Sequence, residues 1–128
     1  MRNGRRTWQR KFADAFRGCS RAFRSQSSFA VHVTVAVIVA AAAAWFRVTA
    51  VEWCLLTLAI GGVLVAEVFN TALESLARGP GSRRHPRLRD ALDMASAAVL
   101  VAATTAAVVG VVVFGPRLLA LVGLGDCN

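Results

Sequence analysis

The sequence predicts an all-α membrane protein with an N-terminal amphipathic surface helix and three transmembrane helices. Three observations favour this class: 56% of the 128 residues are apolar, two long runs carry no charge, and the basic residues gather in two regions. Soluble domains have a smaller apolar share and shorter uncharged runs. We expect the chain, residues 1–128, to form a single membrane domain.

Two uncharged runs are long enough to cross the hydrocarbon of a bilayer as helices. Residues 25–46 form 22 consecutive positions without Asp, Glu, Lys or Arg, and residues 94–116 form 23, whereas a span needs about 20. A third apolar stretch contains three glutamates. The expected spans are about 29–46, 50–77 and 88–114, the last of them stopped by Gly115 and Pro116.

The segment before the first run has the spacing of an amphipathic helix. Apolar residues recur every three or four positions between arginines and a lysine: Trp8, Phe12, Ala15, Phe16, Cys19, Ala22 and Phe23. This pattern predicts a helix at about 7–24 that lies on the membrane surface.

The net charge of +8 is distributed unevenly. Eight of the 15 basic residues precede Ser25, and five lie in residues 78–89. The positive-inside rule places both regions in the cytoplasm, so we expect a cytoplasmic N-terminus and a C-terminus outside. Nucleic-acid binding also uses such charge, but with three apolar helices we expect contact with anionic headgroups and no nucleic-acid partner.

A polar stripe lies within the second expected span. Glu67, Asn70, Thr71 and Glu74 share one face of a helix. Because an ionised carboxylate in hydrocarbon is costly, Glu67 is expected to face the bundle interior, either in catalysis or as a hydrogen-bonding link between helices. The third span carries a polar repeat that could meet this stripe: Asp90, Asp93 and Ser96.

The two carboxylates of the stripe suit phosphoryl transfer. They lie about 10 Å apart along a helix, Glu74 near the membrane edge and Glu67 deeper. The outer one can hold Mg²⁺ with nucleotide phosphates, and the deeper one can take a proton from a lipid alcohol.

The motif itself resembles a known family. "EVFNTALE" at 67–74 closely resembles the ExxNTAxE motif of the small prokaryotic diacylglycerol kinase and undecaprenol kinase family, membrane enzymes with a surface helix and three spans. The resemblance extends without gaps from Phe12 to Leu100. It includes "FADAFRG" at 12–18, "SFAVH" at 28–32, "GSRRHP" at 81–86 and "DMASAAVL" at 93–100.

This resemblance implies a homotrimer in the bacterial cytoplasmic (inner) membrane that transfers the ATP γ-phosphate to a lipid hydroxyl, with Mg²⁺ as cofactor. It assigns the catalytic base to Glu67, supported by Asn70, and metal binding to Glu74 and Gln26. The implied nucleotide residues are Gln26, Glu74, Arg83, Arg84, His85, Arg89 and Asp93. The implied lipid residues are Glu67, Ser96 and Phe29. The alcohol is diacylglycerol or undecaprenol, and the motif does not choose between them.

Four positions depart from the family pattern. Gln26 replaces a metal-binding glutamate, Leu92 replaces a lysine that neutralises phosphate, Arg78 replaces an acidic residue and Ala30 an arginine. Arg89, one turn before Leu92, could compensate for the lost lysine.

Three alternative functions remain open at this stage. The departures allow a lipid-binding pseudoenzyme. A buried glutamate also suits a small proton-coupled transporter subunit, although the polar stripe covers only one end of the span. The third is a structural membrane adaptor.

Overall fold

The computed structural model of the protein describes residues 7–25, 27–81 and 85–123, so Gln26, Arg83 and Arg84 lie outside the described residues. The described part forms four helices: α1 (Trp8–Ser25), α2 (Ser27–Trp45), α3 (Ala50–Ala77) and α4 (Pro86–Leu121). The predicted all-helical class is confirmed, and α2, α3 and α4 are each long and apolar enough to cross a membrane.

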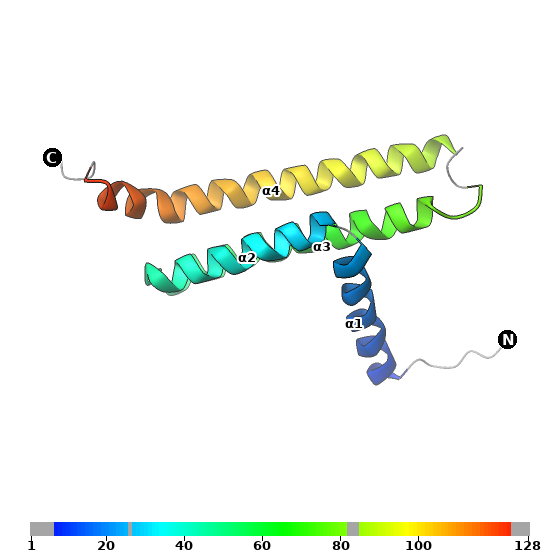
Figure 1. The fold of residues 1–128 in the computed structure, drawn as a ribbon, viewed down its shortest axis with the longest axis horizontal. Helices are drawn as coiled ribbons and strands as arrows, with labels where there is room; N and C mark the ends of the chain where they lie inside the picture. Colours follow the sequence, from blue (N-terminus) through cyan, green and yellow to red (C-terminus); the bar gives the residue numbers. More distant parts are fainter. Residues whose placement is uncertain (1–6, 26, 82–84, 124–128) are drawn as a thin grey trace.

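Helix α3 is the centre of the arrangement. It packs along α4, and its other neighbours are α2 and, more sparsely, α1. Figure 1 shows α3 and α4 side by side and antiparallel, while α1 leaves the bundle crosswise. With 28 and 36 residues, α3 and α4 are roughly 42 and 54 Å long, so each extends beyond about 30 Å of hydrocarbon.

Helix α1 has the amphipathic character that its sequence predicts. Its apolar side chains at Trp8, Phe12, Phe16 and Phe23 are exposed, and Ala22 is buried. The ammonium of Lys11 lies 4.5 Å from the centre of the Trp8 ring. An exposed aromatic face on a basic helix that crosses the bundle suits a position at the membrane surface.

The turn between α2 and α3 is tight and well defined. Arg47 has a φ of 51°, and the amides of Arg47 and Val48 donate to the carbonyls of Ala44 and Ala43. This is the Schellman arrangement that ends a helix, with an arginine at the left-handed position that usually holds glycine. Thr49 and Glu52 then form a capping box that starts α3.

The apolar core lies beside this turn. Ala43, Val48, Leu56 and Val113 are buried together. Next to them the rings of Phe46 and Phe114 have centroids 6.1 Å apart. The core therefore ties α2, α3 and α4 together at one end of the bundle.

Helix α4 departs from the expected bounds. It starts at Pro86, because proline is favoured in the first turn of a helix. The expected stop at Gly115 and Pro116 is wrong, since the helix continues through both residues to Leu121.

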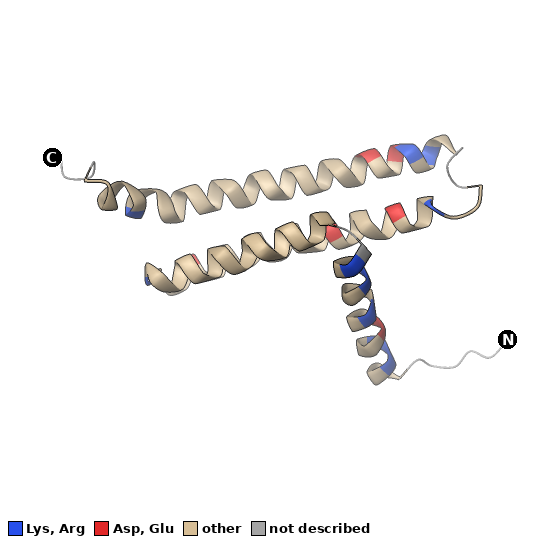
Figure 2. Ribbon diagram, viewed as in Figure 1, with Lys and Arg blue, Asp and Glu red and all other residues tan. Residues whose placement is uncertain are grey.

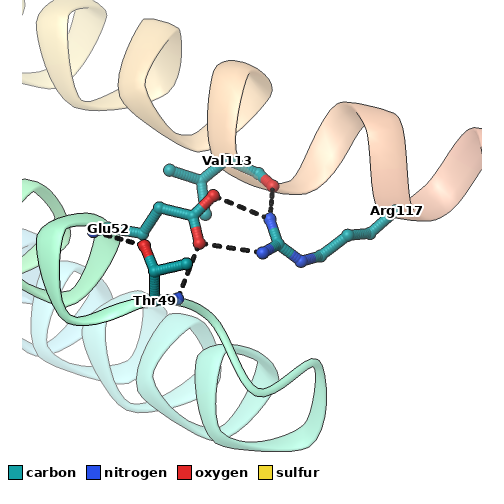
Figure 3. A network of polar contacts seen from close by, with 4 residues as sticks. All are labelled: Thr49, Glu52, Val113 and Arg117. Carbon is teal, nitrogen blue, oxygen red and sulfur yellow. Dashed lines mark hydrogen bonds and ion pairs between the residues drawn. The ribbon is translucent and has the colours of Figure 1, made fainter.

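A polar network holds this extension (Figure 3). The Arg117 guanidinium donates to both carboxylate oxygens of Glu52, at 2.9 and 2.8 Å, and also to the Val113 carbonyl. Glu52 Oε2 accepts from the Thr49 amide at 2.8 Å. Arg117 therefore joins the carboxyl-terminal part of α4 to the first turn of α3, which stabilises the helix beyond the proline.

Charges cluster at the ends of the bundle and are sparse along its middle (Figure 2). Arg117 lies at the end beside the α2–α3 turn, where it contacts Glu52. The blue stretches of α1 and of the first turns of α4 lie toward the opposite end. This distribution is typical of helices whose middle part is surrounded by lipid.

Candidate active site

Glu67 is the most deeply buried charged residue of the described chain. It lies in the second half of α3, and only 2% of its surface is exposed. The Ser28 hydroxyl donates a hydrogen bond to Glu67 Oε1. His32 Nε2 lies 3.3 Å from the same oxygen. The expectation that Glu67 faces the bundle interior is thus met, with α2 as the facing helix.

The start of α2 is anchored by an aromatic contact. Phe29, next to Ser28, is buried, and its ring meets the Phe23 ring edge to face with centroids 6.3 Å apart. Aromatic pairs in this geometry contribute about 0.5–1.5 kcal/mol beyond their burial. The contact joins α1 to α2 and places the first turn of α2 beside Glu67.

A second polar pair follows one turn later on α3. Asn70 Nδ2 donates to Glu74 Oε1 at 2.9 Å, and Arg78 Nη2 lies 3.9 Å from Glu74 Oε2. Asn70 Oδ1 is buried and has no hydrogen-bond partner among the described residues. Thr71, on the same face as Glu67, is buried. The stripe therefore divides into Glu67 with its α2 partners and the Asn70–Glu74 pair nearer the end of α3.

The Asn70–Glu74 pair presents the chemistry that Mg²⁺ prefers. Mg²⁺ binds few protein oxygens and keeps water or substrate phosphates in its other positions. The Glu74 carboxylate, 34% exposed, and the unpartnered Asn70 amide oxygen are two such donors. No cluster of three or more His, Cys, Asp or Glu side chains suited to a metal occurs in the described part of the chain. These two oxygens alone do not complete a metal site, so a cation bound here would need further ligands from outside the described residues.

The polar residues expected on the third span lie apart from the stripe. His85 precedes α4 as its N-cap residue without a side-chain cap bond, and Arg89, Asp93 and Ser96 are exposed. No contact joins them to Glu67 or Asn70 within the described residues. The expected meeting of the third-span polar repeat with the stripe is therefore not formed within one chain.

Sequence reasoning did not assign a catalytic role to Ser28 or His32. Both contact Glu67 from α2, and their spacing of four residues puts them on one helix face. The spacing of four residues could have shown that Ser28 and His32 share a face of α2. It could not show which helix that face would contact.

His32 also lines a groove of the bundle. The groove has a volume of about 380 Å³ and lies between α2 and α4 over α3. Its lining is apolar apart from His32, with small residues such as Ala59, Ala103 and Gly110. His32 is thus shared between an apolar groove and the buried carboxylate.

The buried glutamate, the Asn70–Glu74 pair and the apolar surroundings agree with a comparison of the whole chain. Residues 13–114 match the family described as prokaryotic diacylglycerol kinase. The chain belongs to this family. The matched segment contains the candidate-site residues Ser28, His32, Glu67, Asn70 and Glu74, whereas Arg117 and the end of α4 lie beyond it.

Members of the family with assigned names are similar over most of the chain. An undecaprenol kinase of Bacillus subtilis is 30% identical over 117 residues, covering 91% of this chain and 95% of that protein. A diacylglycerol kinase of Synechocystis is 37% identical over 111 residues, covering 86% of this chain and 63% of that protein. A diacylglycerol kinase of Escherichia coli K12 is 29% identical over 94 residues, covering 73% of this chain and 77% of that protein. No solved structure matches the chain.

Proposed function

We propose that this protein is an ATP-dependent lipid kinase that transfers the γ-phosphate of ATP to the hydroxyl of a membrane lipid. One observation carries the proposal: a carboxylate that is 2% exposed lies inside a membrane-spanning helix, one turn from a polar pair suited to a metal–phosphate ligand. The names of the relatives, undecaprenol kinase and diacylglycerol kinase, support this chemistry.

In this mechanism Glu67 is the general base. One oxygen, Oε1, is engaged by Ser28 and His32, and Oε2 is the proton acceptor. As the lipid hydroxyl loses its proton to Oε2, its oxygen forms a bond to the γ-phosphorus. The bond from that phosphorus to the β–γ bridging oxygen breaks, and the electron pair leaves with ADP.

The nucleotide would lie at the end of α3 where the charges gather. Glu74, Asn70 and Gln26 are the proposed ligands for Mg²⁺, which supplies neutralisation of phosphate charge when bound. The proposed nucleotide contacts are Arg83, Arg84, His85, Arg89 and Asp93. Guanidinium groups suit this task because they bind phosphate oxygens bidentately.

The proposed acceptor is diacylglycerol, giving phosphatidic acid, with undecaprenol as the second candidate. Both lipids present one hydroxyl at headgroup depth. Phe29, one position after Ser28 on α2, and Ser96 on α4 are the proposed lipid contacts. Phe29 is buried against Phe23, so its ring fixes the first turn of α2 beside Glu67.

The protein is proposed to act as a homotrimer. On α3 a row of exposed apolar or small residues alternates spacings of three and four: Leu55, Leu58, Gly62, Val65, Phe69, Ala72 and Leu76. This heptad spacing is that of helices that pack against identical copies, and Gly62 with Ala72 permits close approach.

A trimer would also complete the active site. Asp93 and Ser96 on α4 are exposed and lie apart from the α3 stripe within one chain. Packing of copies along α3 would bring α4 of one subunit near the polar pair of another. The proposed active sites are therefore composite and lie at subunit interfaces.

The proposed location is the bacterial cytoplasmic membrane, with the N-terminus in the cytoplasm and the C-terminus outside. The basic residues of α1 and of residues 78–89 support this orientation, because cytoplasmic segments carry an excess of Lys and Arg. ATP would then reach the site from the cytoplasm.

Neither the comparisons nor the geometry supports the alternatives left open by the sequence. A transporter needs a polar pathway to both faces, whereas the groove that His32 lines is otherwise apolar. A weakened, purely lipid-binding relative is not supported by similarity to proteins named as kinases.

The deciding experiment measures transfer of labelled γ-phosphate from ATP with Mg²⁺ to diacylglycerol and, separately, to undecaprenol in lipid vesicles. We expect a phosphorylated lipid from the wild type. Its rate should fall about 10²–10⁴-fold in Glu67→Gln, because the base is removed while its shape is kept. Absence of product from both lipids, in folded protein, would refute the proposal.

A further inference from the structure

Both polar contacts of Glu67 fall on the same carboxylate oxygen. The Ser28 hydroxyl donates to Oε1, and His32 Nε2 lies 3.3 Å from Oε1. Within the described residues no contact is made to Oε2. The carboxylate is therefore held asymmetrically, with one oxygen engaged and the other open.

The two contacting side chains come from one rigid turn. Ser28 and His32 are four residues apart on α2, so they project from the same face. The buried ring of Phe29 between them, packed on Phe23, fixes that turn relative to α1. Together the two side chains form a clamp, the Ser28–His32 clamp, that reaches α3 from α2.

Glu67 is buried in apolar surroundings, so its few polar contacts matter. Glu67 is 2% exposed, and burying a polar or charged group costs free energy unless hydrogen-bond partners replace its water. The groove that His32 also lines is otherwise apolar. In the described part of the chain, Ser28 and His32 thus supply the polar contacts that replace the lost hydration of Glu67.

We propose that Ser28 and His32 are positioning residues that fix the orientation of the Glu67 carboxylate, with Oε1 held and Oε2 open to the substrate hydroxyl. This inference rests on the proposed function, because the base is useful only if a hydroxyl reacts. Neither residue needs to touch the lipid or the nucleotide.

The first test is steady-state kinetics of the full-length protein with the lipid that the wild type phosphorylates. Ser28→Ala and His32→Leu should each lower kcat about tenfold to a hundredfold, the effect of losing a hydrogen bond to a charged group. The KM for ATP should stay unchanged, because the proposed nucleotide residues lie elsewhere. His32→Gln, which keeps a donor, should recover most of the loss.

A matched control lies on the same helix. The Thr34 hydroxyl donates to the Ala30 carbonyl at 2.9 Å, a local bond within α2. Thr34→Val removes a hydroxyl from α2 without touching Glu67, so wild-type kcat is expected. Wild-type kcat in both Ser28→Ala and His32→Leu would overturn the inference.

A second test does not depend on activity. Dicyclohexylcarbodiimide adds to carboxyl groups in apolar surroundings, and removing a contact to Oε1 should make the Glu67 carboxyl more reactive; the adduct on Glu67 is measured by peptide mass spectrometry. Labelling should rise several-fold in Ser28→Ala and His32→Leu but not in Thr34→Val. Equal labelling in the wild type and the three variants would overturn the proposal that Ser28 and His32 position Glu67. A wild type that phosphorylates no lipid would refute the proposed function, while the labelling would still decide the role of the clamp.

Discussion

Asn70 Nδ2 donates to Glu74 Oε1 at 2.9 Å, and the other amide atom, Asn70 Oδ1, is buried without a hydrogen-bond partner in the described residues. A buried oxygen left without a partner costs about 1–3 kcal/mol. A ligand that donates a hydrogen bond, or a cation, would recover that cost. The pair therefore leaves one acceptor oxygen for a proposed ligand from outside the single chain.

Replacing Glu74 by Gln should weaken the use of Mg²⁺. The amide keeps the size of the side chain but removes the charge that attracts the cation. We expect the Mg²⁺ concentration for half-maximal phosphorylation to rise about tenfold, with partial recovery at high Mg²⁺. Ser75→Ala, one position along α3, is the control. An unchanged Mg²⁺ dependence in Glu74→Gln would exclude Glu74 as a ligand.

Arg89 should matter for nucleotide binding. Arg89 is exposed one turn before Leu92, and the family pattern has a lysine at the position of Leu92. The Arg89 guanidinium can make the phosphate contact that this lysine would make. We expect Arg89→Ala to raise the KM for ATP about tenfold, and Leu92→Lys in the same chain to restore it.

The control for this prediction is Arg87→Ala, which removes an equal charge from the first turn of the same helix. If Arg89→Ala and Arg87→Ala have the same KM for ATP as the wild type, Arg89 does not compensate for the missing lysine.

A larger residue at Gly62 should disrupt the proposed trimer. Within one chain a Cβ at Gly62 would meet no atom within 4 Å, so Gly62→Leu fits the subunit fold. In the proposed interface the added side chain would separate the α3 helices. We expect the detergent-corrected mass, measured by light scattering, to shift toward smaller species and activity to fall with it.

Gly61→Leu is the matched control, because it makes the same change one position outside the exposed row. Its Cβ also has no neighbour within 4 Å in the chain. Trimers that persist in Gly62→Leu would argue against the α3 row as the interface.

Removing the Arg117 guanidinium should loosen the end of α4. Arg117→Met keeps an unbranched side chain but leaves Glu52 and the Val113 carbonyl without this donor. We expect a lower Tm and faster hydrogen exchange in residues 117–121. Phosphorylation should persist, since Glu67 lies about 15 residues, or roughly 22 Å, from Glu52 along α3.

Arg117→Lys is the graded comparison, because an ammonium cannot make the bidentate contact. Its Tm should lie between those of the wild type and Arg117→Met. Equal Tm values for all three proteins would show that the contact adds nothing to stability.

The local sequence pattern was sufficient to predict the helices and part of the candidate site. Apolar runs predicted three spans because a helix in hydrocarbon satisfies its own backbone groups. The spacing of Glu67, Asn70 and Glu74 placed them along one stretch of α3, and their contacts followed that local order: Asn70 reaches Glu74 one turn away. The end of α4 was not predicted, because proline and glycine usually stop a helix. Here Glu52, distant in sequence, binds Arg117 and stabilises the helix beyond Pro116.

The sequence by itself determined the helices, the membrane class and the positions of the carboxylates, since these depend on neighbours within a few residues. Only the tertiary structure decided the partners of the charged groups. Glu67 meets Ser28 from 39 residues away, and Arg117 meets Glu52 across 65. Such contacts depend on which faces of α2 and α4 turn toward α3. That choice is made by packing of the whole bundle, because nearly uniform apolar helices such as α2 and α4 carry little directional pattern of their own.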